Sequence, residues 1–93
     1  MPAYFVARFE VKDAEILADY SASAGPIIAK YQGKVLFKGG ADQILKGADP
    51  LPRIAVFEFP DSDSLEAFYN SEEYQLLGPK RDAGANMVLS AHS

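Results

Sequence analysis

The sequence predicts an α+β domain in which strands and helices follow the order β-α-β-β-α-β. Short segments of alternating apolar residues indicate strands, and apolar residues recurring at spacings of three and four indicate helices. Glycine, proline and aspartate separate these segments. The chain has 93 residues, 48% hydrophobic and 24% charged, which is typical of one globular domain, so we expect a single domain over 1–93.

The first expected strand covers residues 3–11, and a helix follows from a cap at Asp13. The apolar strand face, which should meet the helices, is Phe5, Ala7, Phe9 and Val11; the mixed face is Tyr4, Val6, Arg8 and Glu10. The apolar stripe of the helix is Leu17, Tyr20, Ala24, Ile28 and Tyr31. We expect a kink or a restart at Pro26, and a left-handed cap at Gly33.

Two further strands are expected, over residues 34–38 and 54–59. Gly39 and Gly40 should end the earlier one, and the proline-rich residues 47–52 should form a loop. In the later strand, alternation places Glu58 on the same face as two aliphatic side chains.

The second helix should begin near residue 62 or 63, with Asp61, Ser62 and Asp63 as three possible caps, and Asp63 with Glu66 resembles a capping box. Ser71 is expected to cap a short helical turn over residues 72–77. A connector over 80–85 and a last strand over 86–91 complete the chain.

This order is that of a ferredoxin-like fold, an antiparallel sheet with both helices on one face. We expect strands one and three to be central, parallel neighbours. The sheet face without helices would then expose a large apolar area, which is uncommon on monomers. The sequence therefore predicts a homodimer that packs sheet to sheet. Arg8 and Glu58 should meet on this face, because an unpaired buried charge is costly.

The segment FEFP at residues 57–60 and the segment AFYNSEEY at 67–74 form a recognisable pair. Further matching positions are Ala3, Tyr4, Val11, Asp13, Tyr20, Gly33 and Arg81. Over almost its whole length the chain resembles the uncharacterised bacterial proteins catalogued as domain of unknown function 1330. Phe68 stands where that family usually has tryptophan, and Gln32 replaces the first of two glycines. The resemblance implies a dimeric α/β barrel, usually a homodimer, and no established reaction.

Candidate site residues follow from chemistry. Glu58, a carboxylate inside an apolar strand, is a candidate general acid or base if burial raises its pKa. The candidate ligand-binding residues are Tyr4, Arg8, Tyr20, Tyr69, Tyr74 and Arg81. The tyrosines offer phenolic hydrogen bonds, and Arg81 offers a bidentate contact to a carboxylate or phosphate. Each also has a purely structural interpretation: an ion pair for Glu58, core packing for the tyrosines, and a solvated loop charge for Arg81.

Composition excludes several functional classes. The net charge is −4, and no basic cluster favours nucleic-acid binding. With no cysteine and one histidine, the chain has too few ligands for a protein-only zinc or haem-iron site, so we expect no metal and no cofactor. No apolar run approaches the roughly 18 residues of a membrane span, and no signal peptide is evident, so a cytoplasmic location is expected.

Two functions remain open. The first is a homodimer that binds a small metabolite in a barrel or in a pocket between helices and sheet. The second is a cofactor-independent enzyme acting on a small aromatic or carboxylated metabolite, with Glu58 as acid or base. We favour the first, because the second requires Glu58 to be unpaired and perturbed.

Overall fold

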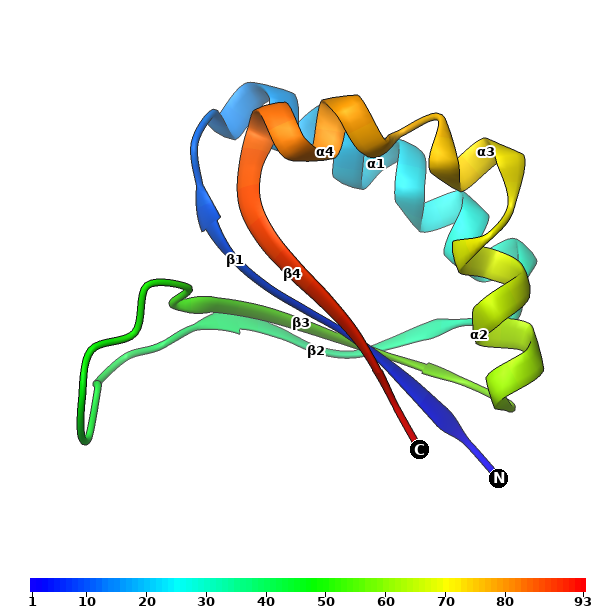
Figure 1. Cartoon of the computed structure of the whole chain (residues 1–93), viewed down its shortest axis with the longest axis horizontal. Coiled ribbons are helices and arrows are strands. Elements are labelled where there is room, and N and C mark those ends of the chain that lie inside the picture. The colour runs from blue at the N-terminus through cyan, green and yellow to red at the C-terminus, as the bar shows by residue number, and fades with distance from the viewer.

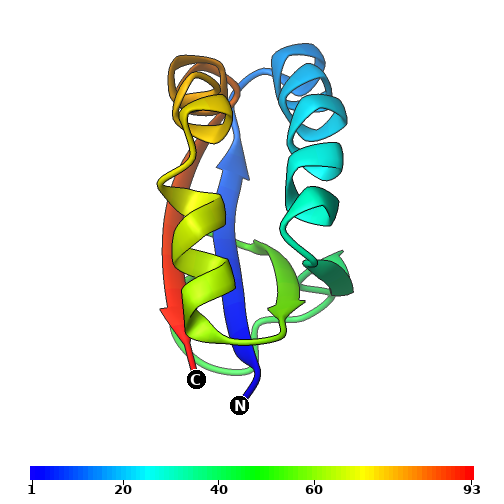
Figure 2. The ribbon, with the colours of Figure 1, turned by 90° about the vertical axis from the view of Figure 1, so that its right-hand side faces the viewer.

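A computed structural model describes all 93 residues. The strands are β1 (Ala3–Val11), β2 (Lys34–Gly40), β3 (Arg53–Phe59) and β4 (Ala85–His92); the helices are α1 (Ala14–Lys30), α2 (Ser62–Tyr69), α3 (Glu72–Gln75) and α4 (Gly78–Gly84). One sheet of order β2-β3-β1-β4 carries all the helices on one face (Figures 1 and 2). The predicted ferredoxin-like order is confirmed, with the expected short turn present as α3 and with α4 added before the last strand. None of the helices is both long and apolar enough to cross a membrane.

The two central strands are β1 and β3, as predicted, but they run antiparallel. The parallel pairing expected from the sequence is therefore wrong. The reason is the direction of the chain. Helix α1 returns the chain so that β2 runs in the same direction as β1, and the reversal into β3 makes β3 run against both of its neighbours.

The alternation of β1 places its apolar face against the helices, as expected. Phe5 is 3% exposed, and the aromatic rings of Phe59, Phe68 and Tyr74 are fully buried beside it. The remaining buried members of this core are Ala3, Tyr20, Ala24, Ile28 and Leu65. The core therefore lies mainly where α1, α2 and α3 all cover the sheet.

Helix α1 starts as predicted and ends differently. The Asp13 carboxylate accepts hydrogen bonds from the amides of Glu15 and Ile16, both at 3.1 Å. The helix continues through Pro26 without the restart that was one of the two expectations. At its end the left-handed residue is Gln32, with φ of 70°, and not Gly33. Gly33 is required for space instead, because a Cβ there would lie 2.7 Å from the Phe59 ring.

The N-terminal ends of the later helices agree only in part with expectation. Asp61, not Asp63, caps α2, since its carboxylate accepts from the Ser64 amide at 2.7 Å. Ser71 caps α3 as predicted, accepting from the Tyr74 amide at 3.2 Å. The expected connector over 80–85 is wrong, because α4 occupies this segment with proline in its first turn, where no amide hydrogen is needed.

The sheet divides at one end. Strand β2 extends through Gly39 and Gly40, which were expected to end it. The β1–β3 ladder stops at the pair Phe9 and Arg53, whereas β1 and β4 stay paired as far as Val11 and Ala85. Figure 1 shows the β2–β3 hairpin diverging from the β1–β4 pair, which curves toward α1 and α4. This divergence opens the space described next.

Candidate ligand-binding cavity

A cavity of about 490 Å³ lies between α1 and the helix-facing side of the sheet, where the strands diverge. It reaches from Phe5 in the packed core to Val11 near the end of β1. Fourteen of its nineteen lining residues are hydrophobic, and its volume lies within the range of small-molecule sites, roughly 300–1,000 Å³. An apolar body of the size of a two- or three-ring metabolite therefore fits.

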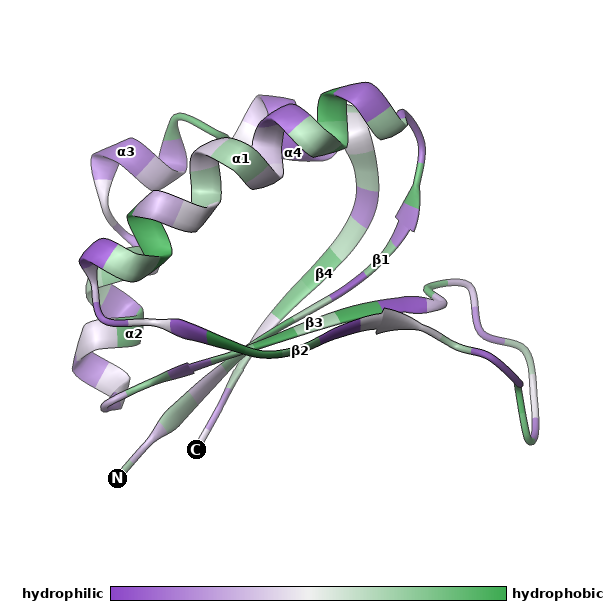
Figure 3. Ribbon diagram, turned by 180° about the vertical axis from the view of Figure 1, so that it is seen from behind, coloured by the Kyte–Doolittle hydropathy of each residue, from purple (hydrophilic) through white to green (hydrophobic).

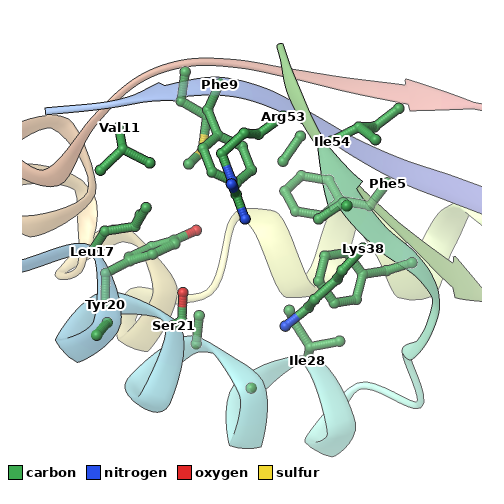
Figure 4. A pocket seen from close by; sticks show the side chains of 18 of the residues that line it. Phe5, Phe9, Val11, Leu17, Tyr20, Ser21, Ile28, Lys38, Arg53 and Ile54 are labelled. Atoms are coloured by element: carbon green, nitrogen blue, oxygen red, sulfur yellow. The ribbon is translucent and has the colours of Figure 1, made fainter. Parts of the chain in front are cut away.

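The polar groups of the cavity are few and come from both walls. Tyr20 and Ser21 belong to α1, Lys38 to β2 and Arg53 to β3. Figure 4 shows the oxygens of Tyr20 and Ser21 and the nitrogens of Arg53 pointing into the same space, with Lys38 reaching toward α1. Both cations lie on the helix-facing side, because Lys38 pairs with Ala55 across β2 and β3, and Arg53 is two residues before Ala55.

The cavity is positive although the chain is acidic. The whole chain has 13 acidic and 9 basic residues, but the lining contains two basic residues and no acidic one. Neither Lys38 nor Arg53 takes part in the four ion pairs of the structure. The Lys38 ammonium lies 5.7 Å from the centroid of the Phe57 ring, a cation–π contact that holds it over the cavity wall.

Behind the cavity, three side chains form a chain of hydrogen bonds. The hydroxyl oxygens of Tyr20 and Tyr74 are 2.7 Å apart, and Arg81 Nη1 donates to the Tyr74 oxygen at 3.3 Å. Burial, and then the neighbouring Tyr74, raise the pKa of Tyr20 far above its ordinary value of 10.0, so its hydroxyl keeps its proton. Tyr20 therefore acts as a hydrogen-bonding group and not as a base.

Aromatic packing holds this chain in place. The ring of Tyr74 lies 4.5 Å from that of Phe68 and 5.7 Å from that of Tyr69, measured between centroids. The guanidinium of Arg81 lies 5.8 Å from the centre of the Tyr74 ring. Tyr69 itself is 36% exposed and does not line the cavity. The structure thus brings Tyr20, Tyr74 and Arg81 together and leaves Tyr69 as a packing partner.

The other predicted site residues lie on the opposite face of the sheet. Tyr4 is paired with Glu58, and Arg8 with Ile54, so Arg8 and Glu58 are separated by four residues along the strand, about 13 Å. The predicted Arg8–Glu58 ion pair is therefore wrong. Arg8 binds Asp49 at 2.7 Å, and Glu58 binds Lys34 at 3.4 Å. The alternation of residues identifies the face that Arg8 and Glu58 share, but it does not give the register between the two strands. The sequence could therefore not show that the two side chains are far apart. A catalytic role for Glu58 stays a prediction.

Two cavity residues, Lys38 and Arg53, were missed by the sequence analysis. The signal for Arg53 was present, since it shares its alternating face with Ala55 and Phe57, which should meet helices. A charge on a face directed at helices is unusual unless it lines a site. It was overlooked because the strand was expected to begin at Ile54.

Comparison with known proteins identifies the family and the fold. The family described as domain of unknown function (DUF1330) matches residues 2–91. No curated protein matches the chain. A protein of unknown function from Rhodopseudomonas palustris is similar at a TM-score of 0.83 and 18% identity, with 97% of this chain and 79% of that chain covered.

Two other solved structures are also similar. SnoaB from Streptomyces nogalater, a cofactor-independent oxygenase, has a TM-score of 0.71 and 13% identity, with 99% of this chain and 91% of that chain covered. A dimeric ferredoxin-like protein of unknown function from Jannaschia sp. CCS1 has a TM-score of 0.65 and 13% identity, with 100% of this chain and 99% of that chain covered. At these identities the likeness establishes the fold and no activity.

Proposed function

Because the chain belongs to the family of domain of unknown function 1330, whose description assigns no reaction, we propose its function from geometry: it binds a small, mainly apolar metabolite in the cavity between α1 and the sheet. The observation that carries this proposal is the half-open apolar hollow with a few polar groups directed into it. Such a combination is characteristic of binding sites for small molecules.

The position of the cavity supports the proposal. The sequence is compatible with two places for a ligand, the barrel and the space between helices and sheet. Side chains that would otherwise complete the core, Phe9 and Met87, border the cavity and remain only half-buried. An apolar ligand that covers this surface would be stabilised by about 25 cal/mol for each Å² of apolar area removed from water.

The binding experiment uses two serines of the same helix. We expect Ser21→Phe to fill the cavity and to abolish binding of the neutral fluorescent probe N-phenyl-1-naphthylamine, because Ser21 borders the cavity. Ser23→Phe is the matched control, since Ser23 is exposed on α1 and does not line the cavity. Fluorescence titration measures both. Equal binding by the two variants would remove the cavity as the binding site.

We also propose that two copies pair through the sheet face that carries no helices. Figure 3 shows hydrophobic residues along the middle of β2, where the ribbon is green. On this face Phe37 is 56% exposed and Val88 is 55% exposed, with half-buried Val6 and Val56 between them. An area of this kind is usually covered by a partner, and two similar proteins are described as dimeric.

The pairing is tested by sedimentation velocity. Phe37→Lys places a charge in the proposed interface and should shift the protein to monomer. Leu76→Lys removes an apolar side chain that is at least as exposed, 72% accessible, on the helical side of the molecule, and should leave the dimer intact. A wild-type monomer at micromolar concentration would refute the proposed pairing.

A further inference from the structure

The hydrogen-bond chain behind the cavity has one direction. Arg81 is always a donor, so the Tyr74 oxygen accepts from it. Tyr74 is fully buried, and the only acceptor within reach of its own hydrogen is the Tyr20 oxygen, 2.7 Å away. The reverse orientation would leave that hydrogen without a partner inside the protein, at a cost of about 1–3 kcal/mol.

This direction determines what Tyr20 does. Its oxygen accepts the hydrogen of Tyr74, so its own hydrogen is free to be donated elsewhere. Figure 4 shows the Tyr20 oxygen pointing into the cavity, on the side toward which Arg53 extends. Burial raises the pKa of Tyr20, so the hydrogen is present at every physiological pH. The cavity therefore contains a neutral hydrogen-bond donor.

Three donors border the cavity, and the lining offers them no acidic partner. The guanidinium of Arg53 and the ammonium of Lys38 come from the sheet, and the Tyr20 hydroxyl comes from α1. Cations without a carboxylate partner beside a donor hydroxyl form a site for an oxyanion, because charge-assisted hydrogen bonds are about twice as strong as neutral ones. Both cations are exposed to water, so a neutral ligand would gain nothing from them, whereas an anion would gain from their charge.

We propose that the ligand is an amphipathic anion, in which an apolar ring body fills the space between Phe5 and Val11 and an oxyanion group, a carboxylate or sulfonate, is bound by Arg53, Lys38 and the Tyr20 hydroxyl. The inference rests on the proposed binding function and adds the ligand class to it. Tyr74 and Arg81 are positioning residues: they orient the Tyr20 hydrogen and do not border the cavity.

The test compares two probes with the same ring framework. 1-Anilinonaphthalene-8-sulfonate carries an anionic group, and N-phenyl-1-naphthylamine lacks it. We expect wild-type protein to bind the sulfonate about tenfold more tightly, and Arg53→Gln to remove that preference without changing the affinity for the neutral probe. Lys46→Gln, which removes the same charge from an exposed loop residue, should retain the preference.

Tyr20→Phe and Tyr74→Phe test the donor. Tyr20→Phe should weaken binding of the sulfonate several-fold and leave the neutral probe unaffected. Tyr74→Phe keeps the Tyr20 hydroxyl but removes the hydrogen bond that orients it. The affinity for the sulfonate should therefore also fall, but by less than in Tyr20→Phe. Circular dichroism confirms that each variant is folded before titration. If either tyrosine variant does not fold, Lys38→Gln tests the anion site through an exposed residue and should also weaken binding of the sulfonate.

The outcomes separate the two proposals. If both probes bind in the cavity, as shown by loss of binding in Ser21→Phe, but with equal affinity, the anionic ligand class is wrong and the binding function stands. An unchanged preference in Arg53→Gln has the same meaning. If neither probe binds saturably, the binding function is refuted and the inference with it.

Discussion

The helix-facing side of the sheet has a packed end and a hollow end. At the packed end Phe59 and Phe68 are fully buried, with ring centroids 5.3 Å apart. At the hollow end Val11 is 41% exposed and Arg53 is exposed, although both belong to the same alternating face. Three helices cover the packed end, whereas the β1–β3 ladder stops at Phe9 and Arg53 at the hollow end.

The comparison shows that alternation selects a face, while neighbouring elements decide which part of that face is buried. The packed end provides the stability of this small domain. The hollow end is free to bind a ligand because the strands beneath it diverge. Substitutions should therefore affect folding at one end and binding at the other, and the following predictions test that division.

The largest effect is expected for Phe68→Ala at the packed end. Phe68 contacts the rings of Phe5, Phe59 and Tyr74, so its removal leaves a cavity in the core. The loss in unfolding free energy should be about 3–5 kcal/mol, a large part of the stability of a domain of this size. Urea denaturation measures it. A loss below about 1 kcal/mol would show that this end is not the stabilising core.

The same substitution, glycine to alanine, can be made at a crowded position and at an open one. A Cβ at Gly84 would lie 2.8 Å from the backbone nitrogen of Leu17, so Gly84→Ala must separate α4 from α1 and should destabilise by about 1–3 kcal/mol. Gly25 borders the hollow end, and a Cβ there would meet no atom within 4 Å apart from its two chain neighbours. Gly25→Ala should change stability by less than about 1 kcal/mol, because the gain in helix propensity is offset by crowding between the new Cβ and the ring of Pro26. Thermal unfolding of both variants tests the pair, and equal shifts would contradict the close approach.

Tyr20 lies at the boundary between the two ends. Tyr20→Phe leaves the buried hydroxyl of Tyr74 without its acceptor and should cost about 1–3 kcal/mol. The double variant Tyr20→Phe/Tyr74→Phe removes both hydroxyls, so it should cost less than the sum of the two single variants. A double-mutant cycle by urea denaturation measures the coupling. Additive effects would mean that the two hydroxyls do not depend on one another.

Glu58 tests whether the outer face of the sheet is separate from both ends. Its ion pair with Lys34 is partly exposed, so Glu58→Gln should change stability by no more than about 0.5 kcal/mol. Because Glu58 does not border the cavity, we also expect unaltered affinity for N-phenyl-1-naphthylamine. A clear loss of probe binding would connect Glu58 to the site and revive its predicted catalytic role.

The smallest effect is expected on the outside of the packed end, where Lys30 binds Glu73 at 3.0 Å. Hydrogen bonds from Lys30 and then Tyr31 lower the pKa of Glu73 from 4.5, and the same pair raises the pKa of Lys30 from 10.5. The acid therefore contributes stability above pH 4.5, which is lost as the pH falls through its folded-state pKa. The lysine contributes below pH 10.5 and loses its contribution as the pH rises through its own raised pKa.

Glu73→Gln should consequently lower the Tm by about 1 °C or less near neutral pH, because the pair is exposed. The difference from wild type should disappear in strong acid and in strong base. Calorimetry between those limits measures it. A difference that persists unchanged in acid would mean that packing, and not charge, accounts for the effect.

The sequence by itself determined the order of the strands and of the helices other than α4, the face of each strand that meets the helices, and the caps Asp13 and Ser71. These depend on neighbours within a few residues, where side-chain periodicity and local hydrogen bonds decide. Tertiary structure alone decided the register that separates Arg8 from Glu58, the contact between the hydroxyls of Tyr20 and Tyr74, and the divergence of strands that exposes Arg53. These features join residues far apart in the chain, and periodicity carries no information about how distant segments align.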